Sequence, residues 1–321
     1  MIIFGTQDLG PLKYFLALEK WIGEVYWITS KNTQALLKNK KCVSLDSIKE
    51  ASMIVTGTSL GDSLDKSLIK KSESLNIPTV SIIEHWSWYK KRFELDGEVI
   101  LPDYIIVNDN YAKDQAINDG LPKKKIFIGG NPHLEELSQS KLSKVILNEW
   151  KEHNNIIKNK IILFITESLK NSFLVNTDDY LGYDEYKVLD DIMEVLPDDY
   201  TLIIKTHPEE KIEKYMDYNL DCVMILDHMS FSEMVQIPNV IIGMGSMLLI
   251  ELAMFRDDII SYRPNARKSF IGEKIGATHH ADSKDKLKKY IIDNPIAASI
   301  SFRQKFVGSG KRILKFLDNL I

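Results

Sequence analysis

The sequence predicts an α/β protein made of two doubly wound domains. Its length of 321 residues exceeds that of a usual single domain, and 44% of these residues are hydrophobic, which is enough for two cores. Short apolar runs rich in β-branched residues alternate with segments of helical apolar spacing in both halves of the chain. Buried strands separated by helices indicate parallel sheets with helices on both faces.

The first half contains the first series of strands and helices. Strands are expected at residues 2–5, 24–29, 51–57, 78–83, 104–107 and 126–128. Helices are expected at residues 12–21, 33–38, 62–75 and 111–119. The third of these helices begins with Asp62 and Ser63, which suit the positive end of a helix. A polar, Lys- and Asn-rich helical stretch at 141–160 then predicts the connection to a second domain.

The second half repeats the alternation without repeating the sequence. Strands are expected at residues 161–165, 201–205, 223–226, 240–243 and 259–262, and helices at 185–196, 231–236, 247–255 and 284–292. A long C-terminal helix, 300–320, is expected to cross back over the first domain. The predicted domains are therefore residues 1–150 and 151–300, followed by the helix of residues 301–321. Ligands of such folds bind at the carboxyl ends of the strands, so a central cleft between both sheets is expected to hold the site.

The net charge and the cysteine content argue against a nucleic-acid-binding protein and a disulfide-stabilised protein. The net charge of −4 argues against a nucleic-acid binder held by phosphate contacts. Cys42 and Cys222 lie in separate halves and predict neither a disulfide framework nor a thiolate metal site. No apolar run is long enough to span a bilayer, so a cytoplasmic protein is expected. The basic stretch 305–315 is either a solvated helix face or a segment that lies peripherally on an anionic membrane.

The segment Lys205-Thr206-His207-Pro208 lies at the end of a predicted buried strand. Open α/β sheets bind ligands at this edge. His207, as a cation or as a neutral N–H donor, would stabilise negative charge on a leaving phosphate. The alternative is structural, since proline is common in a first helical turn and a neighbouring histidine often lies on the surface.

A second phosphate-binding pattern follows the strand at 240–243. Gly245 permits close backbone approach, and Ser246 begins a helix whose free N–H groups attract anions, although Ser246 is equally suited to a plain helix cap. Glu251, further along this helix, is a candidate for hydroxyl recognition. Thr166 ends the first strand of the second series, and Arg263 ends a later one, where it would hold a carboxylate or phosphate of the donor.

The first half supplies loops suited to an acceptor. The loop 5–10, which contains Asp8, lacks the glycine pattern of a dinucleotide site, and the loop 56–62 ends in Asp62. The segment 84–93 follows a buried strand and contains two tryptophans, a tyrosine, Glu84 and His85. Aromatic rings there would stack on sugar faces, and Glu84 or His85 would act as a general base. The structural alternative is an aromatic plug.

No spacing of His, Cys, Asp or Glu in the sequence predicts a metal site.

Taken together, these residues resemble the GT-B superfamily of glycosyltransferases and their nucleotide-sugar relatives. The pair formed by His207-Pro208 and Gly245-Ser246, with Glu251 downstream, resembles bacterial transferases that use CMP-activated acid sugars of the sialyl, Kdo and pseudaminic or legionaminic type. A similar arrangement occurs in CDP-glycerol polyol-phosphate transferases. The segment 129–132, Gly-Gly-Asn-Pro, resembles the hinge of UDP-N-acetylglucosamine 2-epimerases.

The resemblance implies two Rossmann-like domains and a glycosyltransferase. No metal or other cofactor is expected, because protein groups would donate to the phosphate and no obvious Asp-x-Asp lies at a strand end. Its donor would be a CMP-activated nonulosonate, and its acceptor a surface glycan or lipid-linked glycan. His207 would assist phosphate departure and Ser246 would bind the phosphate, with Lys205, Pro208 and Gly245 around it. The Asp/Glu-Asp-Gly motif of inverting sialyltransferases is missing from the first half, so Asp62, Glu84 and His85 are base candidates by position. The alternatives are an epimerase-like enzyme and a polyol-phosphate transferase.

Overall fold

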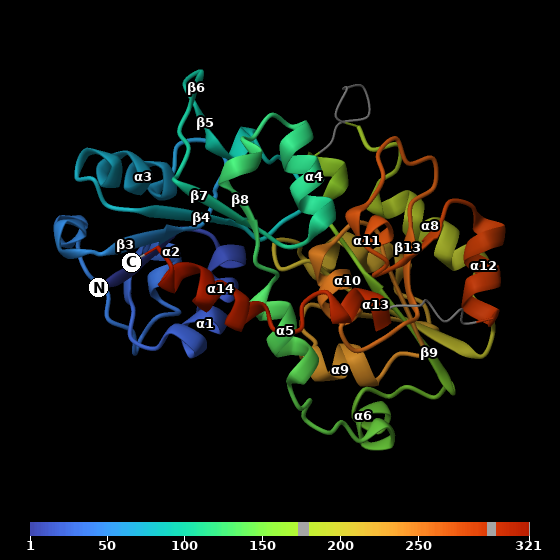
Figure 1. Ribbon diagram of the computed structural model, residues 1–321. Helices are drawn as coiled ribbons and strands as arrows, with labels where there is room; N and C mark the ends of the chain where they lie inside the picture. The colour runs from blue at the N-terminus through green and yellow to red at the C-terminus, as the bar shows by residue number, and fades with distance from the viewer. Residues whose placement is uncertain (173–179, 294–299, 321) are drawn as a thin grey trace. The chain divides into compact units, whose positions relative to one another are not determined.

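The computed structural model describes residues 1–172, 180–293 and 300–320. The described chain divides into two units, Met1–Gln139 with Arg303–Ile321, and Ser140–Phe302 (Figure 1). The first unit ends at Gln139, whereas the sequence placed the change of domain near residue 150. The boundary lies earlier because helix α6 (Leu147–His153) belongs to the second unit.

The first unit has a parallel sheet with the strand order β2-β1-β3-β4-β7-β8. Its strands are β1 (Ile2–Thr6), β2 (Tyr26–Thr29), β3 (Met53–Thr56), β4 (Thr79–Ile83), β7 (Tyr104–Val107) and β8 (Ile126–Ile128). Its helices are α1 (Leu9–Ile22), α2 (Lys31–Gln34), α3 (Leu64–Ser74), α4 (Asn110–Asn118), α5 (Pro132–Gln139) and α14 (Ser309–Asp318). A small hairpin, β5 (Glu94–Leu95) with β6 (Glu98–Val99), follows the aromatic segment and was not predicted.

The second unit has a parallel sheet with the order β11-β10-β9-β12-β13-β14. Its strands are β9 (Lys160–Ile165), β10 (Tyr200–Lys205), β11 (Val223–Leu226), β12 (Val240–Gly243), β13 (Ile259–Tyr262) and β14 (His279–Ala281). Its helices are α6 (Leu147–His153), α7 (Leu169–Ser172), α8 (Glu185–Val195), α9 (Phe231–Gln236), α10 (Met247–Leu252), α11 (Ile271–Lys274) and α12 (Lys284–Asp293). Helix α13 (Ile300–Gln304) spans the division between the units.

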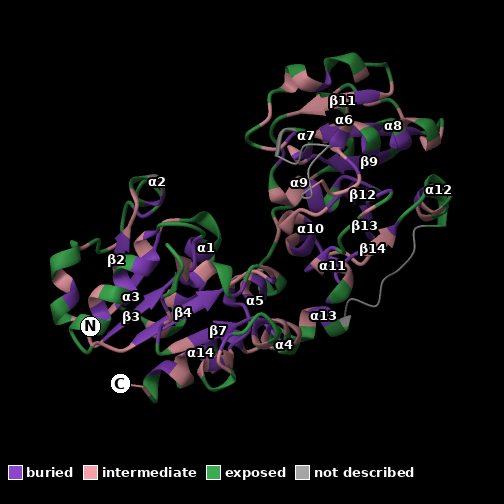
Figure 2. Cartoon of the chain, turned by 90° about the horizontal axis from the view of Figure 1, so that it is seen from above, coloured by how far each residue is buried: buried purple, intermediate pink, exposed green. Residues whose placement is uncertain are grey.

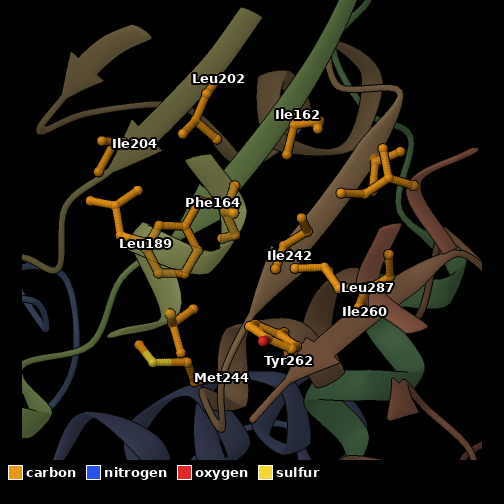
Figure 3. Close-up of a cluster of buried hydrophobic side chains, with 14 of the residues drawn as sticks. Ile162, Phe164, Leu189, Leu202, Ile204, Ile242, Met244, Ile260, Tyr262 and Leu287 are labelled. Carbon is orange, nitrogen blue, oxygen red and sulfur yellow. The ribbon is translucent and has the colours of Figure 1, made fainter. Parts of the chain in front are cut away.

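Alternate residues of the central strands build the core of the second unit. Phe164, Ile204 and Ile242 lie on one face of the sheet, where Leu189 of α8 and Leu287 of α12 belong to the same buried cluster (Figure 3). In each unit the central strands are deeply buried (Figure 2), as β3, β4, β9 and β12 show. Because the sheet centres are dry, polar side chains at the strand ends are held in fixed positions by the packed residues before them.

The predicted C-terminal helix of residues 300–320 is wrong as a single helix. The chain turns at Gly308, which has a φ of 76°, and this conformation ends the run between α13 and α14. Helix α14 packs on α1 and α5, with Ile313 and Leu317 in the core of the first unit. The Glu135 carboxylate accepts hydrogen bonds from the backbone N–H groups of Gly308 and Gly310, so α5 and the C-terminal segment are joined directly.

Among the described residues, no helix combines the length and the apolar character that a bilayer crossing requires.

Candidate functional site

The strand order of the second sheet reverses between β9 and β12. This reversal is the topological switch point at which open α/β sheets bind ligands. Thr166 and Glu167 follow β9, His207 follows β10, and Gly245 follows β12, all at the carboxyl edge. The register pairs Lys205 of β10 with Ile165 of β9, so the two strands end level with each other. The sequence-predicted residues Thr166 and His207 are thus brought together.

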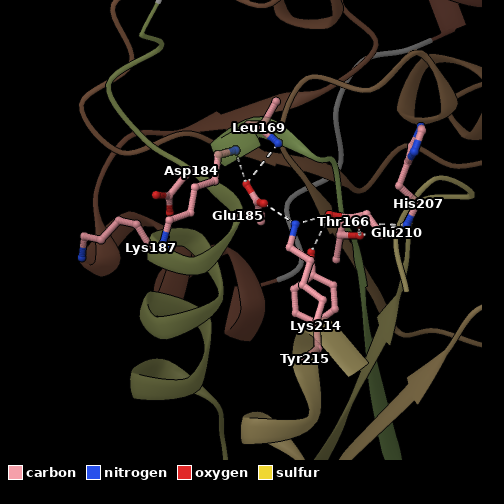
Figure 4. A network of polar contacts seen from close by, with 10 residues as sticks. Thr166, Leu169, Asp184, Glu185, Lys187, His207, Glu210, Lys214 and Tyr215 are labelled. Carbon is pink, nitrogen blue, oxygen red and sulfur yellow. Dashed lines mark hydrogen bonds and ion pairs between the residues drawn. The ribbon is translucent and has the colours of Figure 1, made fainter. Parts of the chain in front are cut away.

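Glu210 ties the His207 segment to the end of β9. The His207 backbone N–H lies 3.0 Å from Thr166 Oγ1 and 3.1 Å from Glu210 Oε2. The Thr166 hydroxyl also donates to Glu210, and Tyr215 OH donates to its other oxygen at 3.0 Å. In Figure 4 the imidazole of His207 extends away from this network. The backbone of His207 is therefore fixed. Its ring Nδ1 accepts the Glu209 backbone N–H at 3.3 Å, which leaves Nε2 of the ring for a ligand.

A buried lysine supports this arrangement. Lys214 pairs with both Glu210 and Glu185 (Figure 4). Glu185 is fully buried and also accepts the backbone N–H groups of Leu169 and Lys170 at 3.1 and 2.8 Å. Burial opposes ionisation of Glu210, but the hydrogen bonds from Lys214, Thr166 and the His207 backbone outweigh it and lower the pKa of Glu210. The ionised network joins the segments that follow β9 and β10.

Glu167 links the two strands of the switch point. Its Oε2 accepts the backbone N–H of Gly245 at 2.6 Å. Burial raises the pKa of Glu167 to about 7, although the backbone hydrogen bonds from Gly245 and Ser246 and the charge of Arg263 favour the ionised form. In the sequence analysis Thr166 was the candidate at this strand end, and Glu167 was given no role. A carboxyl group that titrates near neutrality at a switch point is a stronger candidate for function.

Ser246 and Gly245, which follow β12, differ in their surroundings. Ser246 is the N-cap of α10, and its hydroxyl accepts the N–H of Leu248 at 3.2 Å, so its capping role is realised. A side chain built on Gly245 would meet Phe270 and Glu167 no closer than 3.7 Å. The space beside Gly245 therefore admits a close ligand. Glu251 lies in the last turn of α10 and is half-buried.

Arg263 and Lys205 have defined internal partners. Arg263 is buried, pairs with Glu273, and donates to the Lys268 carbonyl at 2.6 Å. Its guanidinium thus holds the β13–α11 loop in the described arrangement. Lys205 donates to the Thr206 carbonyl at 2.6 Å, and burial lowers the pKa of its ammonium. Pro208 is exposed beside His207.

In the first unit, Glu84 lies at the carboxyl end of β4. Its Oε2 is shielded from solvent and has no hydrogen-bond partner, although the residue as a whole is partly exposed. A side chain at Gly10 would come within 2.8 Å of Glu84 Oε1, so glycine there makes room for the carboxyl group. Burial raises the pKa of Glu84 to about 7, against the charge of Arg92. These properties suit a general base.

His85 and the aromatic segment differ from their expected roles. Burial and the neighbouring Arg92 lower the pKa of His85 to about 4, so its ring is neutral, with Nδ1 2.9 Å from the Ser87 hydroxyl. Trp86 and Tyr89 are 4% and 3% exposed, which rules them out as stacking surfaces for a sugar in this conformation. They form the aromatic plug that was the structural alternative. Trp88 differs, because half of its side chain is exposed.

Asp62 is exposed in the loop after β3, whereas two neighbours that the sequence analysis missed are buried. Asp65 accepts the Ser59 backbone N–H at 2.9 Å, and Lys66 donates to the carbonyls of Ser59 and Gly61 at 2.7 and 2.6 Å. Asp65 lies three and four residues before Leu68 and Ile69, on the buried face of α3, and the folded loop shows that Asp65 and Lys66 hold residues 59–61. Among the described residues, no group of three metal-ligating side chains is found.

The chain was compared with known protein families, protein sequences and solved structures to identify its fold. Neither a model of a known protein family nor a curated protein sequence matches the chain. Solved structures do match. UDP-GlcNAc 2-epimerase from Methanocaldococcus jannaschii superposes with a TM-score of 0.66 at 14% identity, covering 99% of this chain and 100% of that one. Alr3699/HepE from Anabaena, in complex with UDP-glucose, has a TM-score of 0.69 at 10% identity, covering 99% of each chain.

A third similar structure is S. aureus MnaA with UDP, with a TM-score of 0.64 at 13% identity over 100% of this chain and 97% of that one. Identities this low establish the fold alone. The predicted fold class, two Rossmann-like α/β domains of the GT-B type, is confirmed.

Proposed function

We propose that the protein is a nucleotide-sugar-dependent glycosyltransferase whose second unit binds the nucleotide sugar. The observation that carries the proposal is the junction of Glu167, Gly245 and His207 at the switch point of the second sheet. Gly245 leaves space for close approach of a phosphate. Because Nδ1 of His207 accepts the Glu209 backbone N–H, the Nε2–H of the ring is the donor to the phosphate oxygens. Structures with this fold that carry UDP or UDP-glucose support a nucleotide-sugar ligand.

His207 is proposed to stabilise the charge that develops on the departing phosphate. A donor that is already in position costs no reorganisation when the glycosidic bond breaks. The Glu210 network fixes the backbone of His207 and leaves its ring to act. Ser246 and Lys205 contribute the capped helix start and a positive charge at the same edge.

Glu84 is proposed as the base that accepts the proton of the acceptor hydroxyl. Among the three base candidates, Asp62 is exposed and His85 has its pKa lowered to about 4 by burial and Arg92, while the pKa of Glu84 is raised by burial to about 7. A base with a pKa near the working pH transfers protons most effectively. The acceptor would be a glycan or a lipid-linked glycan.

Two features favour different nucleotides. The His-Pro and Gly-Ser segments resemble transferases of CMP-activated nonulosonates, while the similar solved structures carry UDP or UDP-sugars. The epimerases among them support a second candidate, an epimerase-like enzyme acting on UDP-N-acetylglucosamine without an acceptor. A polyol-phosphate transferase that uses CDP-glycerol is a further alternative, supported by the His-Pro segment alone.

Thermal unfolding in the presence of CMP, CDP, UDP and GDP tests nucleotide binding. A ligand at a hundredfold excess over its Kd stabilises the native state by about 2.7 kcal/mol. We expect one pyrimidine nucleotide to raise the unfolding temperature, and His207→Ala to abolish or weaken this rise. His153→Ala, an exposed histidine on α6, is the matched control and should keep it. The proposal fails if no nucleotide stabilises the protein.

Turnover of the matching nucleotide sugar then separates the candidates. Consumption that depends on an added glycan supports transfer. Interconversion or hydrolysis of the nucleotide sugar without any acceptor supports the epimerase-like alternative instead.

A further inference from the structure

Trp88 has a backbone conformation that is uncommon for a bulky residue. Its φ is 62°, in the left-handed region, where bulky residues are strained. The other non-glycine residues with positive φ in the described part of the chain are Asn76, Asp96, Asn155 and Asn265. All of these are Asn or Asp, whose short polar side chains tolerate this region. Among these residues Trp88 alone has a bulky aromatic side chain.

The conformation of Trp88 carries backbone strain, and yet half of its side chain stays in solvent. A residue held in the left-handed region costs about 1 to 3 kcal/mol. The indole is 50% exposed, and the contact made to its face is the Lys91 ammonium, 4.6 Å from the ring centroid. An exposed cation–π contact contributes about 0.5 to 1 kcal/mol. Strain of this kind concentrates at binding sites, which points to recognition.

The surroundings hold the indole outward. Trp86 and Tyr89, on either side in the sequence, are buried and anchor the segment after β4. Arg92 accounts for the turn between them: its backbone N–H donates to the Trp88 carbonyl at 3.0 Å, and its side chain donates to the carbonyls of Ser87 and Thr58 at 2.9 and 2.8 Å. Arg92 therefore holds the Trp88 backbone at the carboxyl edge and ties this segment to the loop that follows β3.

Positive charge accompanies the ring. Lys90, Lys91 and Arg92 are consecutive, in a chain whose net charge is −4. Lys90 lies 3.8 Å from the carboxylate of Glu94, and Arg92 is engaged by backbone carbonyls, whereas the partner of Lys91 within the described residues is the indole itself. An aromatic face with a cation beside it suits a ligand that has both an apolar face and an acidic group.

We propose that Trp88 and Lys91 form an anionic-saccharide subsite, in which the indole stacks on a pyranose ring and the ammonium binds its carboxylate or phosphate. Carbohydrate rings present C–H groups on one face, which matches an exposed indole. The subsite adds to the proposed function that the acceptor contains an acidic sugar unit. This statement about the acceptor rests on the proposed function, whereas the binding of an acidic sugar at Trp88 and Lys91 does not.

Ligand-observed saturation-transfer NMR on the full chain tests the subsite. The observed ligands are glucuronic acid, N-acetylneuraminic acid and glucose, and inorganic phosphate, which has no C–H protons to observe, is measured by its competition with them. We expect the two sugar acids to bind at least tenfold more tightly than glucose or phosphate at low salt. Equal binding of glucose would overturn the role of Lys91, and equal binding of phosphate would overturn the role of the ring.

Two variants locate the binding. Trp88→Gly removes the indole, and glycine adopts the same φ without strain, so the variant should unfold at the wild-type temperature or above it. It should lose at least tenfold in affinity for both acids, and Lys91→Met should lose the preference for acids over glucose. Trp150→Phe, a half-buried tryptophan of the second unit, is the control and should bind like wild type. Unchanged binding by Trp88→Gly would overturn the proposal.

The nucleotide experiment keeps the two proposals separate. Trp88→Gly should retain the nucleotide-induced rise in unfolding temperature, and its loss would assign the ring to the nucleotide and overturn the saccharide subsite. If wild type binds the sugar acids but no nucleotide, the proposed function fails while the subsite stands.

Discussion

The Glu167 carboxylate accepts the backbone N–H of Gly245 at 2.6 Å, and this hydrogen bond crosses the point where the strand order of the second sheet reverses. The bond fixes the backbone at the position where a phosphate would approach. Burial of Glu167 disfavours its ionised form, so the free energy of unfolding falls as this carboxyl group loses its proton. The consequence can be measured in the stability of the protein.

Glu167→Gln should remove a pH-dependent loss of stability. Burial raises the pKa of Glu167 from 4.5 to about 7 in the folded protein, so the native state binds the proton more tightly than the unfolded chain. The contribution of Glu167 is complete below about pH 4.5 and declines as the pH rises through 7. Glutamine keeps the oxygen that accepts from Gly245 and does not ionise. The variant should gain about 1 to 3 kcal/mol relative to wild type between pH 5 and pH 8, measured by urea unfolding.

A flat difference between the two proteins across this range would contradict the raised pKa of Glu167. Glu251→Gln, at a half-buried carboxylate on α10, is the comparison variant.

Glu84→Gln should remove turnover while leaving nucleotide binding intact. The general base acts in its ionised form, and burial raises the pKa of Glu84 to about 7. In wild type, kcat/KM should therefore rise tenfold per pH unit below about 7 and level off above it. The variant should lose about 100-fold or more in kcat/KM, and its residual activity should lack this rise. Asp62→Asn, in the exposed loop after β3, is the control.

If Asp62→Asn loses the activity and Glu84→Gln keeps it, the base has been assigned to the wrong carboxylate.

Gly245→Ala should separate binding from folding. The added methyl would lie 3.7 Å from Phe270 and 3.9 Å from Glu167, which are ordinary contact distances, so the free energy of unfolding should change by less than about 1 kcal/mol. The methyl would occupy the space proposed for a phosphate. We expect the nucleotide-induced rise in unfolding temperature to disappear. Retention of that rise would place the phosphate elsewhere.

Lys214→Met should destabilise the second unit and slow turnover together. The substitution leaves Glu185, which is fully buried, without its cation, and an uncompensated buried charge costs about 3 to 5 kcal/mol. It also removes the lysine that holds Glu210 against the His207 backbone. Lys214→Arg should restore much of both properties. Lys70→Met breaks an exposed pair with Glu98 and should cost less than about 1 kcal/mol by urea unfolding.

A cost as small for Lys214→Met as for Lys70→Met would show that the buried network contributes little.

The sheets were predictable because their strands are unusually uniform. The run from Thr79 to Ile83, rich in β-branched residues, predicts a buried strand at the centre of a sheet, and all five of its residues are buried. The strand His279–Ala281 was missed because it is short and begins with two histidines, and only pairing with β13 makes it a strand. Local pattern therefore identifies the central strands and fails at the sheet edge, where tertiary contacts decide.

The candidate site was predictable by position and not by interaction. His207 was found because it follows a clear strand. Glu210 was assigned no distinct role, since its partner Thr166 lies 44 residues away in the sequence and no local signal connects them. Glu84 was one of three base candidates, and burial, which a sequence pattern does not give at a strand end, distinguishes it from Asp62. Spacing finds strand ends, whereas the fold decides which groups there lose water.

The joining of the C-terminal segment to the first unit has a consequence for synthesis. Helix α14 follows the entire second unit in the chain, yet its residues Ile313 and Leu317 complete the core that residues 1–139 begin. When the nascent chain leaves the ribosome, the early segment must wait with an open apolar face until the second unit and α14 (Ser309–Asp318) have been translated. The second unit, which is continuous, is free to fold first, so the order of folding is expected to run against the order of synthesis.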